Sequence, residues 1–230
     1  MFSKFVNNKK VLYGVLSLAL LLVILLMIVA LKKVNVSTNG GNYIGLSSIN
    51  LAIFNSIGSN KAMDIISTII LGLAIAMAVG FAVLGLIQVI KRKKLEAIDT
   101  PIKALALVYV ITGWIYLIFD YVLVVNYRPT TEAISTSPSF PSTHTMVILM
   151  VFLTGITVLE GIIKNKKAIY GYEIGCGVLG VVAIVTRMLS GKHWFTDIIA
   201  GILFALLLYF FHKFIIELLN EYQVKHTNNQ

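Results

Sequence analysis

The chain has 230 residues, of which 58% are hydrophobic and 13% charged, and its mean hydropathy is +0.89. Soluble domains contain about 45–50% apolar and about 25% charged residues, so this composition excludes a water-soluble globular fold. The net charge of +9 does not predict nucleic-acid binding, because the basic residues cluster in short segments between apolar runs. The single cysteine, Cys176, excludes an intramolecular disulfide.

Taken in chain order, the apolar runs predict six membrane-spanning helices, since each span needs roughly 20 residues. We predict that the first run is retained, because Lys32 and Lys33 follow it where a signal-peptide cleavage site would have small residues. Residues 34–64 are rich in Asn, Ser and Gly, and we expect an interfacial helix or a surface loop there. The predicted spans cover approximately residues 11–31, 65–90, 104–125, 142–163, 169–185 and 194–214. The expected fold is an all-α polytopic bundle of six transmembrane helices.

Lysine and arginine residues in the short loops predict the orientation of this bundle. Five basic residues lie within 91–103, three within 164–167 and three within the first ten residues. The loops on the other side carry fewer, namely Lys32, Lys33 and Lys61, then Arg128, then Arg187 and Lys192. We therefore expect a multi-pass cell-membrane protein with both termini in the cytoplasm, and the pair Lys32–Lys33 is the one signal against this.

Ionisable residues gather at the extracytoplasmic ends of the predicted spans. They are Arg128, His144, Arg187, His193 and Asp197. Charged groups at membrane depth are costly and usually functional, so we expect one shared site on the extracytoplasmic side.

The residue types at this site indicate phosphoryl transfer. His193 and Asp197 are four residues apart, so the carboxylate can orient the imidazole as a nucleophile. The two arginines offer forked donors for phosphate oxygens, and Ser142 and Thr143 open a helix whose N-terminus favours an anion. With His144 as the acid, these groups suit a reaction through a phosphohistidine.

Three motifs in this order resemble those of the type 2 phosphatidic acid phosphatase superfamily, whose lipid phosphate phosphatases are related to bacterial acid phosphatases and vanadium haloperoxidases. The family signatures are Lys-x6-Arg-Pro, Pro-Ser-Gly-His and Ser-Arg-x5-His-x3-Asp. The corresponding residues here are Arg128-Pro129, Pro141-Ser142-Thr143-His144 and Thr186-Arg187, followed by His193 and Asp197. The resemblance covers roughly residues 104–217 and implies an acid phosphatase/haloperoxidase-like core.

The resemblance also implies a role for each matching residue. His193 is expected to be the nucleophile, Asp197 to orient it and His144 to protonate the leaving oxygen. Arg128 and Arg187 are expected to clamp the phosphoryl oxygens, with Ser142 and Thr143 assisting them. The family needs no metal and no cofactor. A metal site on the two histidines and Asp197 is disfavoured, because two arginines would repel the cation.

Three positions depart from the family pattern. Tyr121 stands where the first signature has Lys, which removes one cation from the phosphate clamp, and Lys192 is the candidate to replace it. Thr143 replaces the Gly of the second signature, and Thr186 replaces the Ser of the third. Asp120, in the third predicted span, is expected to form a structural hydrogen bond or to pair with Arg128.

The predicted organisation is a first span with an extracytoplasmic interfacial segment (1–64), a membrane-embedded phosphatase core (65–217) and a polar cytoplasmic tail (218–230). The expected activity is hydrolysis of a lipid phosphomonoester or diphosphate, with undecaprenyl diphosphate, phosphatidylglycerol phosphate or phosphatidate as substrate. Two alternatives remain open, namely a lipid phosphotransferase and a non-catalytic lipid-binding or transport protein on the same scaffold.

Overall fold

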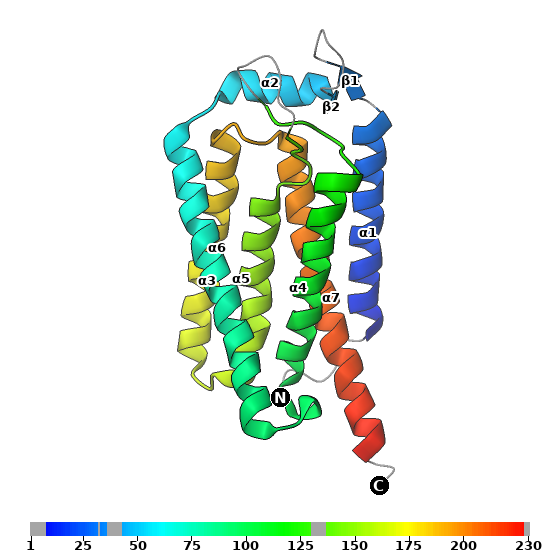
Figure 1. Cartoon of the computed structure of the whole chain (residues 1–230), viewed down its shortest axis with the longest axis vertical. Coiled ribbons are helices and arrows are strands. Elements are labelled where there is room, and N and C mark those ends of the chain that lie inside the picture. Colours follow the sequence, from blue (N-terminus) through cyan, green and yellow to red (C-terminus); the bar gives the residue numbers. More distant parts are fainter. Residues whose placement is uncertain (1–7, 32, 36–42, 130–136, 228–230) are drawn as a thin grey trace.

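The structure, a computed structural model, describes residues 8–31, 33–35, 43–129 and 137–227. Its elements form an upright bundle of long helices (Figure 1). In chain order they are α1 (Asn8–Leu31), β1 (Lys33–Asn35), β2 (Tyr43–Gly45), α2 (Ser47–Ile57), α3 (Lys61–Arg92), η1 (Leu95–Ala97), α4 (Thr100–Leu117), η2 (Ile118–Val122), α5 (Thr143–Ile162), α6 (Lys166–Leu189) and α7 (Phe195–Thr227). Six of the described helices are long and apolar enough to cross a membrane, which confirms the predicted fold class.

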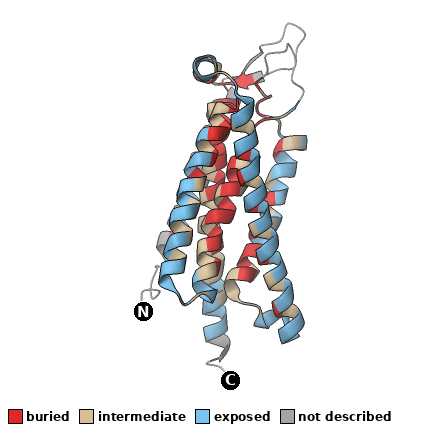
Figure 2. Ribbon diagram, turned by 90° about the vertical axis from the view of Figure 1, so that its left-hand side faces the viewer, coloured by how far each residue is buried: buried red, intermediate tan, exposed pale blue. Residues whose placement is uncertain are grey.

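α5 is the central helix of the bundle. It packs against α3, α4, α6 and α7, whereas α1 packs mainly against α7. Half of the most apolar window of α5 is buried, compared with 11% for α1 and for α6. Figure 2 shows the buried residues along the middle of the bundle. The start of α1 and the end of α7 lie at the same end, as an even number of spans requires (Figure 1).

The outer faces of the bundle carry large apolar side chains. Leu20 of α1, Ile69 of α3 and Val181 of α6 are each at least 60% exposed. In water this much contiguous apolar surface would mark an interaction site. In a bilayer, lipid tails cover it, and the helices satisfy their own backbone hydrogen bonds. The protein is therefore an integral membrane protein.

The segment that follows α1 caps one end of the bundle. β1 and β2 pair as an antiparallel hairpin, with Val34 opposite Ile44, and α2 then lies across the ends of the other helices (Figure 1). Gly45 allows the hairpin to sit tightly on α1, because a Cβ there would lie 2.2 Å from the carbonyl oxygen of Val29. Of the two expectations for this segment, a helix or a loop, residues Ser47–Ile57 form a helix.

Two helices begin earlier than the apolar runs predicted, because polar side chains cap them. Asn60 accepts from the backbone N–H groups of Ala62 and Met63 and starts α3, and Asn165 starts α6 in the same way. Such caps each stabilise a helix by about 1 kcal/mol.

α7 ends later than predicted. The sixth span was expected to end near residue 214, with a polar tail from 218, but the helix continues to Thr227. No Gly or Pro follows Gly201 in the sequence to terminate it, and the Leu, Glu, Gln and Lys residues beyond 214 are good helix formers.

Candidate active site

His193 lies in the short turn that joins α6 to α7, at the end of the bundle covered by α2 (Figure 1). The turn passes through Gly191, whose φ of +68° favours glycine. A Cβ on Gly191 would lie 2.5 Å from the Cβ of Ser59, so the turn also packs closely against the α2–α3 connection. Only 3% of His193 is exposed as a result.

The partners of the two ring nitrogens determine the tautomer of His193. Nδ1 lies 2.8 Å from the carbonyl oxygen of Ser139, and Nε2 lies 2.9 Å from Nη2 of Arg187. A carbonyl oxygen only accepts and a guanidinium only donates, so Nδ1 carries the proton and Nε2 presents its lone pair. His193 is therefore a neutral imidazole whose unprotonated Nε2 faces a buried arginine.

The surroundings also keep this imidazole neutral. Burial lowers the pKa of His193 below its ordinary value of about 6.5, and the charges of Arg187 and Arg128 lower it further. The Asp197 carboxylate opposes this shift without reversing it. The imidazole is consequently unprotonated at neutral pH, which is the state that a nucleophile requires.

Asp197 is fully buried in the first turn of α7. Its Oδ2 accepts from the backbone N–H of Trp194 at 3.0 Å, which caps the helix, and its Oδ1 accepts from Nδ2 of Asn126 at 2.8 Å. Oδ2 lies 3.7 Å from Nδ1 of His193, outside hydrogen-bond distance. The direct contact that orients the imidazole is thus the Ser139 carbonyl, and Asp197 acts on it through its charge.

Two buried asparagines attach the cap formed by β2 and α2 to this site. Asn126 accepts from the backbone N–H of Gly45 at 2.8 Å, besides donating to Asp197. Asn50 of α2 donates to the Gly45 carbonyl at 2.8 Å and to Oγ1 of Thr196 at 2.9 Å. Sequence reasoning missed both asparagines, because each lies in a segment predicted to be polar and no spacing distinguishes it from an ordinary loop residue.

The structure brings the two predicted arginines and two predicted histidines together. The Arg187 side chain is 3% exposed, and its Nη1 lies 2.8 Å from Oδ1 of Asp64 in the first turn of α3. Arg128 donates from Nε to the carbonyl of Pro138 at 3.2 Å. His144, in the first turn of α5, lies within electrostatic range of both arginines and of His193. Asp64 carries no motif spacing and was missed from sequence.

Ser142 and Thr143 occupy different positions at the start of α5. Ser142 is fully buried and caps the helix, with Oγ 3.0 Å from Oγ1 of Thr145 and its own N–H donating to the backbone carbonyl of Asp197 at 2.9 Å. Ser142 thereby joins the first turns of α5 and α7. Thr143 instead lines the cavity beside the site.

A cavity of about 200 Å³ adjoins His193. Arg128 and Thr143 line its polar part, and Phe119 and Tyr116 line its apolar part. The cavity extends from the buried imidazole to Tyr116 of α4, which is 42% exposed. Within the described ranges, no three His, Cys, Asp or Glu side chains are grouped as a metal site.

The end of α4 determines which residue faces this cavity. α4 passes into a wider π-helical turn, η2, in which the backbone N–H of Leu123 donates to the Ile118 carbonyl at 2.7 Å. Tyr121, at the position of the signature lysine, is 72% exposed and does not line the cavity, whereas its neighbour Asp120 does. Lys192 is exposed and also lies outside the cavity lining.

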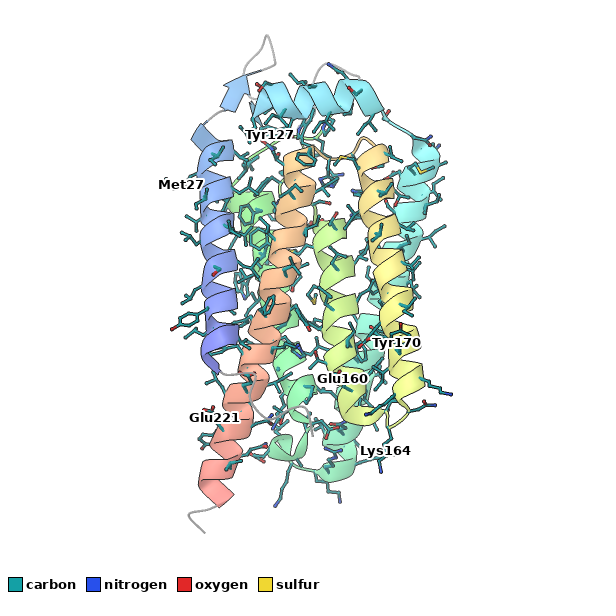
Figure 3. The ribbon with its side chains drawn as sticks, turned by 180° about the vertical axis from the view of Figure 1, so that it is seen from behind. Met27, Tyr127, Glu160, Lys164, Tyr170 and Glu221 are labelled. Carbon is teal, nitrogen blue, oxygen red and sulfur yellow. The ribbon has the colours of Figure 1, made fainter. Side chains whose placement is uncertain are left out.

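Arg128 and its neighbours lie at the end of the bundle under α2. Figure 3 labels Tyr127 there, and Lys164 and Glu221 near the opposite end. The Tyr127 carbonyl accepts from the indole N–H of Trp194 at 2.6 Å, which ties the segment before Arg128 to the turn that carries His193.

Comparison with known families identifies this architecture. Residues 101–217, about half of the chain, match the PAP2 superfamily. The chain belongs to the PAP2 superfamily, as its three motifs predicted. All five of the predicted ionisable site residues lie inside the matched segment, whereas α1, α2 and α3, including Asp64, lie outside it.

A solved structure shares the fold. The chain is similar to the crystal structure of the first transmembrane PAP2 type phosphatidylglycerolphosphate phosphatase from Bacillus subtilis, with a TM-score of 0.60 and 22% sequence identity. The similarity covers 87% of this chain and 94% of that chain. A comparison with curated protein sequences gave no significant match.

Proposed function

We propose that this protein is a lipid phosphate phosphatase that hydrolyses a phosphomonoester or diphosphate through a phosphohistidine on His193. The observation that carries the proposal is the neutral imidazole, whose Nε2 lone pair lies 2.9 Å from the Arg187 guanidinium. A phosphoryl group beside Arg187 would meet the nucleophile and a permanent positive charge together. Membership of the PAP2 superfamily supports the same reaction.

In the first step, Nε2 of His193 attacks phosphorus and forms the P–N bond while the bond to the leaving oxygen breaks. His144, as the acid, gives its proton to that oxygen, so the lipid alcohol or the lipid monophosphate leaves protonated. Arg128 and Arg187 stabilise the charge on the remaining phosphoryl oxygens. The positive imidazole ring keeps its Nδ1–H on the Ser139 carbonyl, with the Asp197 carboxylate nearby.

In the second step, water attacks the phosphoryl group from the side that the leaving group vacated. His144, now neutral, takes the proton of that water, and the P–N bond breaks with its electron pair returning to Nε2 of His193. Inorganic phosphate is released, and both histidines return to their starting states. No metal ion is needed, because the two arginines supply the positive charge.

The cavity supports a lipid substrate. It joins the buried imidazole to the exposed face of Tyr116, so a headgroup can reach His193 while its acyl or prenyl chains stay in the bilayer. Phosphatidylglycerol phosphate is one candidate, because the similar Bacillus subtilis protein is a phosphatidylglycerolphosphate phosphatase. Undecaprenyl diphosphate and phosphatidate are the others.

We assign this site to the extracytoplasmic side. The lysine-rich connections at 91–103 and 164–167 lie at the end opposite α2, where Figure 3 labels Lys164. Positive connecting loops are typical of the cytoplasmic side. The substrate is then a lipid whose headgroup is presented by the outer leaflet.

The test is phosphate release by purified protein from phosphatidylglycerol phosphate, phosphatidate and undecaprenyl diphosphate, with and without EDTA. We expect release from at least one lipid, unaffected by EDTA and abolished in His193→Ala. His226→Ala, near the far end of α7, is the matched control and should keep full activity. Phosphate transfer to an added lipid acceptor instead of water would identify a phosphotransferase. Lipid binding without release or transfer would refute catalysis and favour a binding protein.

A further inference from the structure

The guanidinium of Arg187 is held by two partners from different parts of the chain. Nη1 lies 2.8 Å from Oδ1 of Asp64, and Nη2 lies 2.9 Å from Nε2 of His193. The third nitrogen, Nε, is buried and has no hydrogen-bond partner within the described residues. Because a guanidinium is planar and rigid, fixing Nη1 and Nη2 also fixes the direction in which Nε donates.

The start of α3 places Asp64 beside the site. The backbone N–H of Asn60 donates to the Leu189 carbonyl at 3.0 Å, which ties the beginning of α3 to the end of α6. Gly191 lets the α6–α7 turn approach the neighbouring Ser59 closely. Asp64 is thus positioned by backbone contacts to the end of α6, which carries Arg187, and to the turn that carries His193. Its carboxylate is 30% exposed, whereas the arginine side chain it contacts is 3% exposed.

We propose that Asp64 is a positioning residue for phosphoryl transfer, which rests on the proposed function. It occupies Nη1 of Arg187 and thereby directs the edge formed by Nη2 and Nε toward the phosphoryl group bound at His193. That edge provides two parallel N–H donors, which suit two phosphoryl oxygens. Asp64 itself does not touch the substrate. α3 lies outside the segment that matches the superfamily, so this contact adds a residue from the N-terminal half to the site.

A positioning role predicts that the defect appears mainly in kcat. A displaced arginine stabilises the transition state less well, and a misplacement of about 1 Å costs on the order of 100-fold in rate. We expect Asp64→Ala to lower kcat by about 10- to 100-fold with less than about a three-fold change in KM. Asp64→Asn retains an oxygen that can accept from Nη1, so it should recover most of the lost kcat.

The matched control is Asp99→Ala. Asp99 forms the other ion pair that α3 makes in the described chain, with Arg92 at 2.6 Å, at the opposite end of the helix. Both alanine variants lose an Asp–Arg pair of α3, and thermal inactivation in detergent measures the stability cost of each. Asp99→Ala should keep the wild-type kcat. A lower kcat in Asp64→Ala, after correction for the amount of folded protein in both variants, then results from a displaced Arg187 guanidinium.

Vanadate separates this inference from the proposed function, because it binds a phosphoryl site without turnover. Calorimetry should show at least about ten-fold weaker vanadate binding in Asp64→Ala than in Asp99→Ala, because the two donors of Arg187 are displaced. A ten-fold change in affinity corresponds to about 1.4 kcal/mol of binding free energy. If the wild-type protein releases no phosphate, the proposed function fails while this difference still supports positioning. Wild-type kcat and vanadate affinity in Asp64→Ala, or no recovery in Asp64→Asn, would overturn the inference.

Discussion

Replacing Asn126 by Asp tests the buried network around Asp197 without changing its shape. Asn126 is fully buried, and its amide nitrogen donates to Oδ1 of Asp197 at 2.8 Å. The substitution puts a carboxylate oxygen where that donor was, while the other oxygen can still accept from the N–H of Gly45. The variant therefore isolates one effect, the replacement of a donor by a like charge.

The geometry sets the size of this effect. Two negative charges 2.8 Å apart repel each other by about 6 kcal/mol at an effective dielectric constant of about 20. The variant can avoid most of this repulsion if one of the two carboxylates binds a proton. At pH 7, protonation costs about 4 kcal/mol for a carboxyl group whose ordinary pKa is near 4. The cost falls by about 1.4 kcal/mol for each unit of pH below 7. A protonated carboxyl then donates to its neighbour as the amide did.

We expect Asn126→Asp to be much less stable than the wild-type protein at pH 7, and nearer to it at pH 5. The assay is the midpoint of thermal inactivation in detergent at both pH values, together with phosphate release. Asn165→Asp is the control, because Asn165 caps α6 at an exposed position and Asp caps a helix equally well. A variant as stable as wild type at pH 7, or one whose deficit does not shrink in acid, would refute the assigned network.

Three further predictions concern His193 and the packing of α7 beside it. Because burial lowers the pKa of His193, its neutral form persists below pH 6.5. We therefore expect kcat/KM to fall on the acid side of its pH profile only below pH 6.5. A fall that begins above that pH would contradict the burial argument. His193 binds a proton more readily in the unfolded chain than in the folded protein. We therefore expect His193 to make the folded protein less stable as pH decreases through about 6.5, which the midpoint of thermal inactivation measures. Gly201→Ala should destabilise by about 1–3 kcal/mol, because its Cβ would lie 2.7 Å from the Ser142 carbonyl. Gly175→Ala, where a Cβ meets nothing within 4 Å, should not lower the inactivation midpoint, and equal effects of the two would refute the packing argument.

The predicted spans agree with the structure because spanning a membrane depends on a local property. A run such as 143–162 is long and apolar enough by itself, whatever it packs against. The errors lie at helix ends, where a single cap such as Asn60 or the absence of a terminator after Gly201 moves the boundary. A single capping residue is a weaker indicator than a run of about twenty apolar residues. The sequence therefore predicted the presence of each helix better than the positions of its ends.

Motif spacing identified the residues of the candidate site but not all of their contacts. The order of Arg128, His144, Arg187, His193 and Asp197 was sufficient to predict a common site. The ring of His193, however, bonds the Ser139 carbonyl rather than the Asp197 carboxylate. A backbone oxygen has no residue type that a pattern can recognise. Similarly, the π-helical turn at the end of α4 decides that Asp120, and not Tyr121, faces the cavity.

The sequence alone determined the membrane class and the number of spans, and it predicted the candidate residues for a phosphoryl site, because each depends on residue type and short spacing. Only the tertiary structure decided the tautomer of His193 and the partner of Arg187. Asp64 lies 123 positions before Arg187, and the two meet only because the start of α3 packs against the end of α6. Hydrogen-bond partners between distant segments depend on how helices pack, and helix packing has no short-range pattern in the sequence.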